Sequence, residues 1–244
     1  MELYWAHKVD DAFAYLDQEE THHCIKVMRN QPGNEVEVTD GLGNKYAAMI
    51  ADYNKKECRL QLISRLSGMT QKRAHCHIAM APTKNISRFE WFLEKATELG
   101  VDEITPLICS RSERVQLKLP RLQKQVIAAM KQSLRTRLPA LHEPCKFSDF
   151  ISKYQRPDSN TTDQQGLCKI ICYCGEHDLP KLRELCKPDS HCVILIGPEG
   201  DFTPDEIAHA LNSGFSGAGL GQARLRTETA GLVAVQTFQL INDC

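Results

Sequence analysis

The pattern of hydrophobic and polar positions changes near residue 70. Before that point, short segments alternate apolar and polar residues, at 35–39, 45–50 and 58–63. A period of two predicts half-buried strands, and the glycine-rich sequence at 40–44 predicts a hairpin turn between two of them. The segment at 22–30 lacks this alternation and is expected to be helical or irregular. The pattern over residues 1–70 therefore predicts a small β-barrel-like domain.

From residue 74 onward, short apolar runs alternate with segments of helical period. Strands are predicted at 76–81, 104–109, 169–173 and 193–196, and helices at 87–99, 122–138, 179–186, 205–213 and 229–241. Such alternation is typical of an α/β domain with a parallel sheet and helices on both faces. The polar, aperiodic segment at 67–73 separates the two patterns, so we expect a second domain at 74–244.

Two glycine-rich loops follow predicted strands of the second domain. The first, Gly-Pro-Glu-Gly at 197–200, ends the apolar run at 193–196 and leads into a capping-box pattern that begins at Thr203. The second, at 217–221, reads Gly-Ala-Gly-Leu-Gly. Ligands of parallel sheets bind at the carboxyl ends of the strands, and glycine lets a flat ligand approach the backbone. We expect the loops to form two walls of one pocket.

Common nucleotide and hydrolase motifs do not explain these loops. The loop at 217–221 lacks the chain length after it that a dinucleotide-binding unit requires, and no Lys-Ser or Lys-Thr follows the loop at 197–200 as in a phosphate-binding P-loop. No G-x-S-x-G nucleophile elbow occurs. Taken singly, each glycine could simply meet the requirement of a turn.

Charged residues recur around the predicted pocket. Arg226 and Glu228 lie among small and apolar residues before the last helix, so both are expected at the pocket edge. The formal net charge is −1, so nucleic acid would have to be recruited by local basic clusters. Such clusters predict a phosphate-contacting rim from Lys84, Arg88, Arg111, Arg114, Lys131, Arg135 and Arg137. In the first domain, Lys26 and Arg29 fit either solvated surface residues or RNA contacts.

Cysteine and histidine usage favours a reduced protein without a metal. The 11 cysteines are scattered, odd in number and mostly in apolar strands, as expected for core thiols of a cytoplasmic protein. Two groups, Cys172 and Cys174 with His177, and Cys76 with its two flanking histidines, lack a C-x-x-C pair, and alternate strand positions simply share a face. No signal peptide or membrane span is apparent.

Several of these segments together resemble the RsmE family of SPOUT methyltransferases, which methylates N3 of a uridine in small-subunit (16S) ribosomal RNA. The resemblance spans nearly the whole chain. It rests on the sequences at 196–202, 220–221 and 225–230, on 94–101 before 104–106, on 111–114, on Gln132-Ser133 with Arg135, and on Asp40-Gly41-x-Gly43.

This resemblance implies a fold, a cofactor and partners. The fold would be an N-terminal PUA-like β-barrel for RNA, followed by a SPOUT domain whose parallel sheet contains a trefoil knot. The knot would hold S-adenosylmethionine in a bent pose, and a homodimer would build each active site at its interface. The partner would be small-subunit ribosomal RNA or the assembled 30S particle, with no metal or membrane involved.

The expected reaction and the charge pattern then suggest roles for individual residues. Arg226 would stabilise the uridine anion, and Glu228 would either orient Arg226 or act as the base. Cofactor contacts are expected from Leu195, Ile196, Gly197, Pro198, Glu199, Gly200, Leu220, Gly221, Leu225, Thr229 and Ala230. RNA contacts are expected from Lys26, Arg29, Lys84, Arg88, Arg111, Arg114, Gln132 and Arg135. Two alternatives remain open: a SPOUT methyltransferase acting on a different RNA, and a non-catalytic RNA-binding protein.

Overall fold

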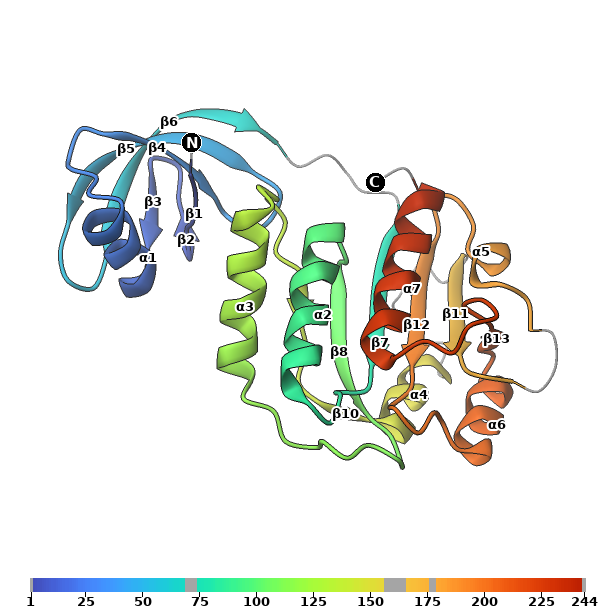
Figure 1. Cartoon of the computed structure of the whole chain (residues 1–244). Coiled ribbons are helices and arrows are strands. Elements are labelled where there is room, and N and C mark those ends of the chain that lie inside the picture. Colours follow the sequence, from blue (N-terminus) through green and yellow to red (C-terminus); the bar gives the residue numbers. More distant parts are fainter. Residues whose placement is uncertain (1, 69–73, 156–165, 176–178, 243–244) are drawn as a thin grey trace. The chain divides into compact units, whose positions relative to one another are not determined.

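The computed structural model describes residues 2–68, 74–155, 166–175 and 179–242 (Figure 1). The chain divides into two compact units. One unit combines Met1–Gln71 with Val126–Leu138, and the other combines Lys72–Gln125 with Pro139–Cys244. The sequence places the domain boundary at 67–73. Residues 69–73 of this segment lie outside the described part of the chain, so that boundary stays a prediction.

The first unit is built on a six-stranded sheet. Its strand order is β1 (Leu3–Trp5), β4 (Glu35–Thr39), β5 (Lys45–Tyr53), β6 (Cys58–Ser67), β3 (Phe13–Leu16) and β2 (Lys8–Val9). Shifts of register between β5 and β6 mark irregularities that bend such a pair. The predicted hairpin turn is confirmed, because the segment at 40–44 joins the antiparallel strands β4 and β5. Within the turn, the Asp40 carboxylate accepts hydrogen bonds from the backbone N–H groups of Leu42 and Asn44.

Two short helices follow β3 in this unit. Helix α1 (Gln18–His22) begins at Asp17, whose carboxylate accepts the backbone N–H groups of Glu19 and Glu20. It continues directly into a π-helix, η1 (His23–Val27). The segment at 22–30, expected to be helical or irregular, is therefore mostly a π-helical turn, and Lys26 lies on it.

Helix α3 (Leu119–Gln132) is shorter than the 122–138 pattern predicts. It ends because Leu134 adopts a left-handed backbone conformation with φ of 55°. The residues after it instead bond to the hairpin turn: the Gly43 N–H donates to the Thr136 carbonyl at 2.9 Å, and the Leu138 N–H donates to the Gly41 carbonyl at 2.8 Å. These bonds and the ion pair of Lys131 with Glu20 link the segment 126–138 to the rest of the first unit.

The second unit confirms the predicted α/β class. Its sheet has the order β10 (Cys145–Lys146), β8 (Glu103–Ile108), β7 (His75–Met80), β12 (His191–Ile196), β11 (Leu167–Cys172) and β13 (Ser216–Ala218), with β9 (Ala140–Leu141) beside β8. Every pairing in it is parallel. Its complete helices are α2 (Ile86–Leu99), α4 (Phe147–Gln155), α5 (Leu182–Leu185), α6 (Pro204–Asn212) and α7 (Thr227–Asn242).

The strands of this sheet alternate their side chains between two helical layers. On one face, Ala79, Leu107 and Leu195 share a core with Phe150 of α4 and Ala210 of α6. The intervening strand residues face α2 and α7, and α7 packs on α2, β7 and β12 (Figure 1). The two layers follow from the period of two along a strand, and they leave the carboxyl ends of the strands open for a site.

Local signals set the ends of two helices as predicted. Gly100 ends α2 with a left-handed φ of 94°, and Thr203 with Glu206 forms the reciprocal capping box of α6. The structure also has elements that the sequence analysis missed, namely β9, β10 and α4.

All cysteines among the described residues are free thiols. Within the same residues, no helix has both the length and the apolar character needed to cross a bilayer.

Candidate active site

A pocket of about 1340 Å³ lies at the carboxyl ends of three neighbouring strands. The strand ends are aligned, because Cys172 of β11 pairs with Ile196 of β12 on one side and with Ala218 of β13 on the other. Both glycine loops line this pocket, as predicted. A third wall, which the sequence analysis missed, comes from the segment after β11 and includes Tyr173, Leu179 and Lys181.

Most of the predicted cofactor residues line this pocket. Those that do are Ile196, Gly197, Pro198, Glu199, Leu220, Gly221, Leu225 and Ala230. Three others do not belong to its lining. Leu195 is fully buried in the core that includes α4 and α6, Gly200 packs against Arg111, and Thr229 is half-buried on α7. Leu195 is excluded because neighbouring strand residues point to opposite faces.

Asp201 determines the shape of the first glycine loop, although the sequence analysis gave it no role. Its backbone has a left-handed φ of 60°, and its N–H donates to the Pro198 carbonyl at 2.9 Å. One carboxylate oxygen accepts the N–H of Phe202 at 2.8 Å, and the other accepts the N–H of Cys174 at 2.9 Å. One side chain thus ties the loop after β12 to the loop after β11.

Two arginines that were predicted to contact RNA hold loop backbone in place. Arg111 donates to the carbonyl of Gly200 at 2.6 Å. Arg114 donates to the carbonyl of Lys84 at 2.7 Å and also to that of Thr83. Since a guanidinium carries five N–H donors, these bonds leave others for a phosphate. Both arginines therefore shape the rim, whether or not they contact RNA.

Glu199 and Lys84 join the same rim. A Glu199 carboxylate oxygen accepts the backbone N–H of Lys84 at 2.9 Å, which ties the first glycine loop to the segment before α2. The Lys84 ammonium lies 2.7 Å from a carboxylate oxygen of Glu113, and this exposed pair raises the pKa of Lys84. The rim around the pocket is thus a set of mutually bonded loops.

Arg226 and Glu228 lie in different environments. Arg226 is exposed and lines the pocket, whereas Glu228, two residues later, is buried. One Glu228 oxygen lies 3.7 Å from Nε of Arg88, and the other has no hydrogen-bond partner among the described residues. The observed partner of Glu228 is therefore Arg88, which the sequence analysis had assigned to RNA.

The predicted RNA contacts are divided between the two compact units. Lys84, Arg88, Arg111 and Arg114 belong to the second unit, around the pocket, whereas Lys26, Arg29, Gln132 and Arg135 belong to the first. In the first unit, Lys131 forms an ion pair with the buried carboxylate of Glu20. The seven basic residues were predicted to form a single rim around one edge of the sheet. Only Lys84, Arg88, Arg111 and Arg114 of that rim belong to the second unit.

Glu206 joins the segment after β8 to the start of α6, and its removal should destabilise the protein. Its buried carboxylate accepts N–H groups from Ser110 at 2.8 Å and Thr203 at 2.9 Å. We expect Glu206→Ala to reduce the free energy of unfolding by about 2 kcal/mol, because two backbone N–H groups lose a charged acceptor and the capping box of α6 is broken. Urea denaturation measures the change. The matched control is Asp205→Ala, which removes an exposed carboxylate from the same helical turn; an equal loss there would contradict the assignment.

Comparison with known proteins agrees with this architecture. The model of an RNA methyltransferase domain matches residues 70–239, and that of an RNA methyltransferase PUA domain matches residues 16–63. The fold and pocket thus define a two-domain RNA methyltransferase. Sequence relatives narrow the assignment. A ribosomal RNA small subunit methyltransferase E from Synechocystis is 30% identical over 233 residues, which cover 93% of this chain and 73% of the relative. The chain belongs to the ribosomal RNA small subunit methyltransferase E family.

Further relatives and solved structures are similar over most of their length. The Buchnera aphidicola (Acyrthosiphon pisum) enzyme of this family is 27% identical over 93% of this chain and 87% of its own. A probable rRNA methyltransferase from Porphyromonas gingivalis is 34% identical with a TM-score of 0.86, covering 100% of this chain and 99% of that one. A putative methyltransferase from Legionella pneumophila, solved with bound SAM, is 25% identical with a TM-score of 0.83, covering 99% and 98%.

Proposed function

We propose that this protein transfers the methyl group of S-adenosylmethionine to N3 of one uridine in small-subunit ribosomal RNA. The observation that carries the proposal is the pocket at the ends of β11, β12 and β13, where two glycine loops lie beside Arg226. Relatives named for small-subunit ribosomal RNA methylation and a neighbour solved with SAM support the substrate and the cofactor. We expect the reaction to take place in the cytoplasm.

The residues of the pocket fit a bent nucleoside cofactor. A Cβ on Gly197 would lie 3.1 Å from the Phe202 ring, closer than side chains normally pack, so glycine suits this position and the loop presents bare backbone. At Gly221, with φ of 133°, the space that a Cβ would occupy is open. Ile196 and Leu225 add apolar surface for the adenine. The volume exceeds the about 300–1,000 Å³ typical of small-molecule sites, which leaves room for a nucleotide.

Arg226 and Glu228 would supply the chemistry that the acceptor needs. The cofactor brings a methyl group already activated by its sulfonium, so the protein must align uridine N3 and manage its proton. As N3 loses that proton, charge spreads onto the uracil oxygens. The exposed guanidinium of Arg226, which lines the pocket, would stabilise that charge. Glu228 is the carboxylate nearest in sequence to Arg226, and its unbonded oxygen is a candidate acceptor for the proton.

Replacing Glu228 tests the role of this carboxylate. We expect Glu228→Gln to lower kcat by about 10²-fold, because the amide has the same shape but cannot accept the proton. The comparison is Arg88→Gln, which removes the ion-pair partner of Glu228 but keeps the carboxylate. If Arg88→Gln lowers kcat equally, Glu228 serves only to position Arg88.

A transfer assay with labelled S-adenosylmethionine tests the function itself. The acceptors are 30S particles, protein-free 16S ribosomal RNA and transfer RNA, and the modified nucleoside is identified by mass spectrometry. We expect N3-methyluridine in small-subunit RNA. Transfer to transfer RNA alone would show a different substrate, and cofactor binding without transfer to any acceptor would indicate a non-catalytic RNA-binding protein.

The trefoil knot and the homodimer belong to the same proposal. A dimer would allow a second copy to complete the site beside the exposed Arg226. Light scattering should then give twice the chain mass of 27.5 kDa. A monomeric mass in a preparation with full transfer activity would remove the dimer from the mechanism.

A further inference from the structure

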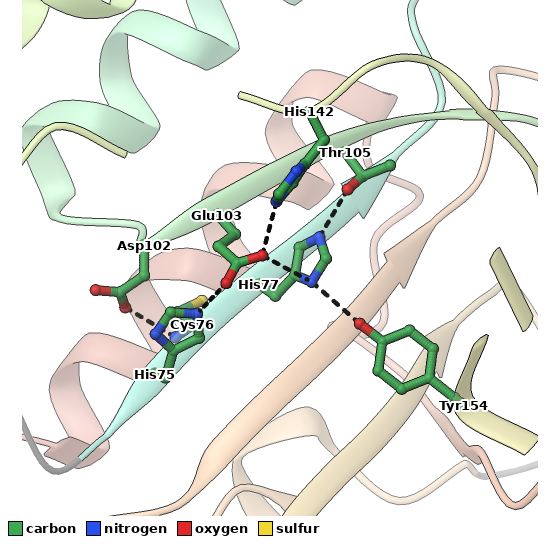
Figure 2. Close-up of polar contacts among 8 residues, drawn as sticks. All are labelled: His75, Cys76, His77, Asp102, Glu103, Thr105, His142 and Tyr154. Carbon is green, nitrogen blue, oxygen red and sulfur yellow. Dashed lines mark hydrogen bonds and ion pairs between the residues drawn. The ribbon is translucent and has the colours of Figure 1, made fainter. Parts of the chain in front are cut away.

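Histidines surround Glu103 at the end of the parallel sheet where the strands begin (Figure 2). The pocket lies at the other end, where the strands finish. His75 and His77 come from the start of β7, and Glu103 opens β8, directly beside His77. His142 follows β9. Parallel pairing aligns the beginnings of the strands, so residues far apart in the sequence meet here.

The ligand-capable atoms of three residues converge. Glu103 Oε2 lies 2.7 Å from His142 Nε2 and 3.6 Å from His77 Nδ1. These three atoms all lie within 4.8 Å of one another. His77 is buried, Glu103 is half-buried and His142 is exposed, so the group is anchored in the core and open to solvent on one side.

Surrounding hydrogen bonds orient two of these groups. His75 Nε2 lies 2.8 Å from the second carboxylate oxygen of Glu103, leaving Oε2 directed toward His77 and His142. His77 Nε2 lies 2.8 Å from the Thr105 hydroxyl. When Nε2 donates its hydrogen to Thr105, the Nδ1 lone pair points into the group, where Tyr154 OH is 3.2 Å away. Bonds of this kind orient metal ligands in proteins.

The chemistry of the group also suits a cation. Two imidazole nitrogens and one carboxylate oxygen converge here. These are donor types that Zn²⁺ takes in proteins.

We propose that His77 Nδ1, Glu103 Oε2 and His142 Nε2 bind a Zn²⁺ ion, with water or the Tyr154 hydroxyl in the fourth position. Tetrahedral Zn²⁺ bonds of about 2.1 Å place neighbouring ligand atoms about 3.4 Å apart. The 3.6 Å between His77 and Glu103 already matches this spacing. The contact between Glu103 and His142 must lengthen from 2.7 Å, which the exposed His142 side chain can accommodate.

The site would stabilise the second unit and leave methyl transfer unchanged. It joins β7, β8 and the segment after β9, a strand of two residues that pairs with β8. The pocket lies where the strands end, so the ion would not reach the reacting atoms. The ion is thus a structural one, independent of the proposed reaction.

Calorimetric titration of the metal-free protein with ZnCl₂ tests the proposal, together with thermal unfolding. We expect His142→Ala, which changes an exposed side chain, to weaken Zn²⁺ binding at this site at least tenfold and to abolish a Zn²⁺-dependent rise in Tm. Glu103→Gln should do the same. The matched control is His191→Ala, which removes an exposed histidine that stacks on His75 at 5.7 Å but is not a ligand, and should behave like the unmodified protein.

Cysteine thiols elsewhere in the chain can also bind zinc, so the difference between variants is the measurement. Co²⁺ bound by nitrogen and oxygen alone lacks the thiolate charge-transfer band, which separates the two kinds of site spectroscopically. Equal binding and equal Tm shifts in His142→Ala and the unmodified protein would overturn the proposal. An equal loss in His191→Ala would show adventitious surface binding instead.

Discussion

Arg226→Ala should lower the rate of methyl transfer by about 10²–10³-fold while S-adenosylmethionine binds with nearly unchanged affinity. Arg226 is exposed on the pocket wall and forms no ion pair with Glu228, whose partner is Arg88. Its guanidinium is therefore available to the uracil oxygens as they gain charge. A donor that acts only on developing charge affects the transition state and leaves ground-state binding of the cofactor unchanged.

Single-turnover transfer and calorimetry with the demethylated cofactor measure the two effects separately. The matched control is Arg224→Ala, which removes an exposed arginine of the same loop that also lines the pocket. We expect a far smaller loss of rate there. A comparable loss of cofactor affinity in Arg226→Ala would place Arg226 in the cofactor-binding wall instead.

Gly197→Val should abolish cofactor binding, with a loss of affinity of about 100-fold or more. The added Cβ alone would lie 3.1 Å from the Phe202 ring and 3.2 Å from its backbone nitrogen, closer than side chains normally approach. Phe202 is buried, so it cannot retreat, and the loop that presents bare backbone must shift instead.

Calorimetry measures this loss, and circular dichroism confirms that the variant is folded. Gly219→Ala is the comparison, because its methyl group would lie 3.7 Å from Leu179 Cβ, an ordinary contact, so the loop should keep its shape and much of its affinity. Unchanged affinity in a folded Gly197→Val protein would place the cofactor elsewhere.

Much of the second unit could be predicted because its signals are local. The capping box at Thr203 and the left-handed Gly100 each act within one turn of a helix, and both occur as predicted. Helix α4 was missed, although Phe147, Phe150, Ile151 and Tyr154 have helical spacing, because the short strand before it gave no sign of a new element. Helix α3 was predicted too long because its last residues bond to a distant turn.

The site was predictable in position but not in its connections. Glycine loops after apolar runs indicated the pocket, since parallel strands end at one edge. The third wall after β11, the link made by Asp201 and the pairing of Glu228 with Arg88 were not visible. An acidic residue directly after the glycine loop could have indicated a role for Asp201. Nothing in the sequence indicated that its partner would be the backbone N–H of Cys174.

The sequence by itself determined most of the longer strand and helix segments, the two glycine loops and, through resemblance to a family, the reaction to expect. Only the tertiary structure decided which charged groups meet: Glu228 with Arg88, Arg111 with the loop it holds, and Glu103 with three histidines. Periodicity and capping depend on residues a few positions apart, whereas these contacts depend on strand order and on loops that bring distant segments together.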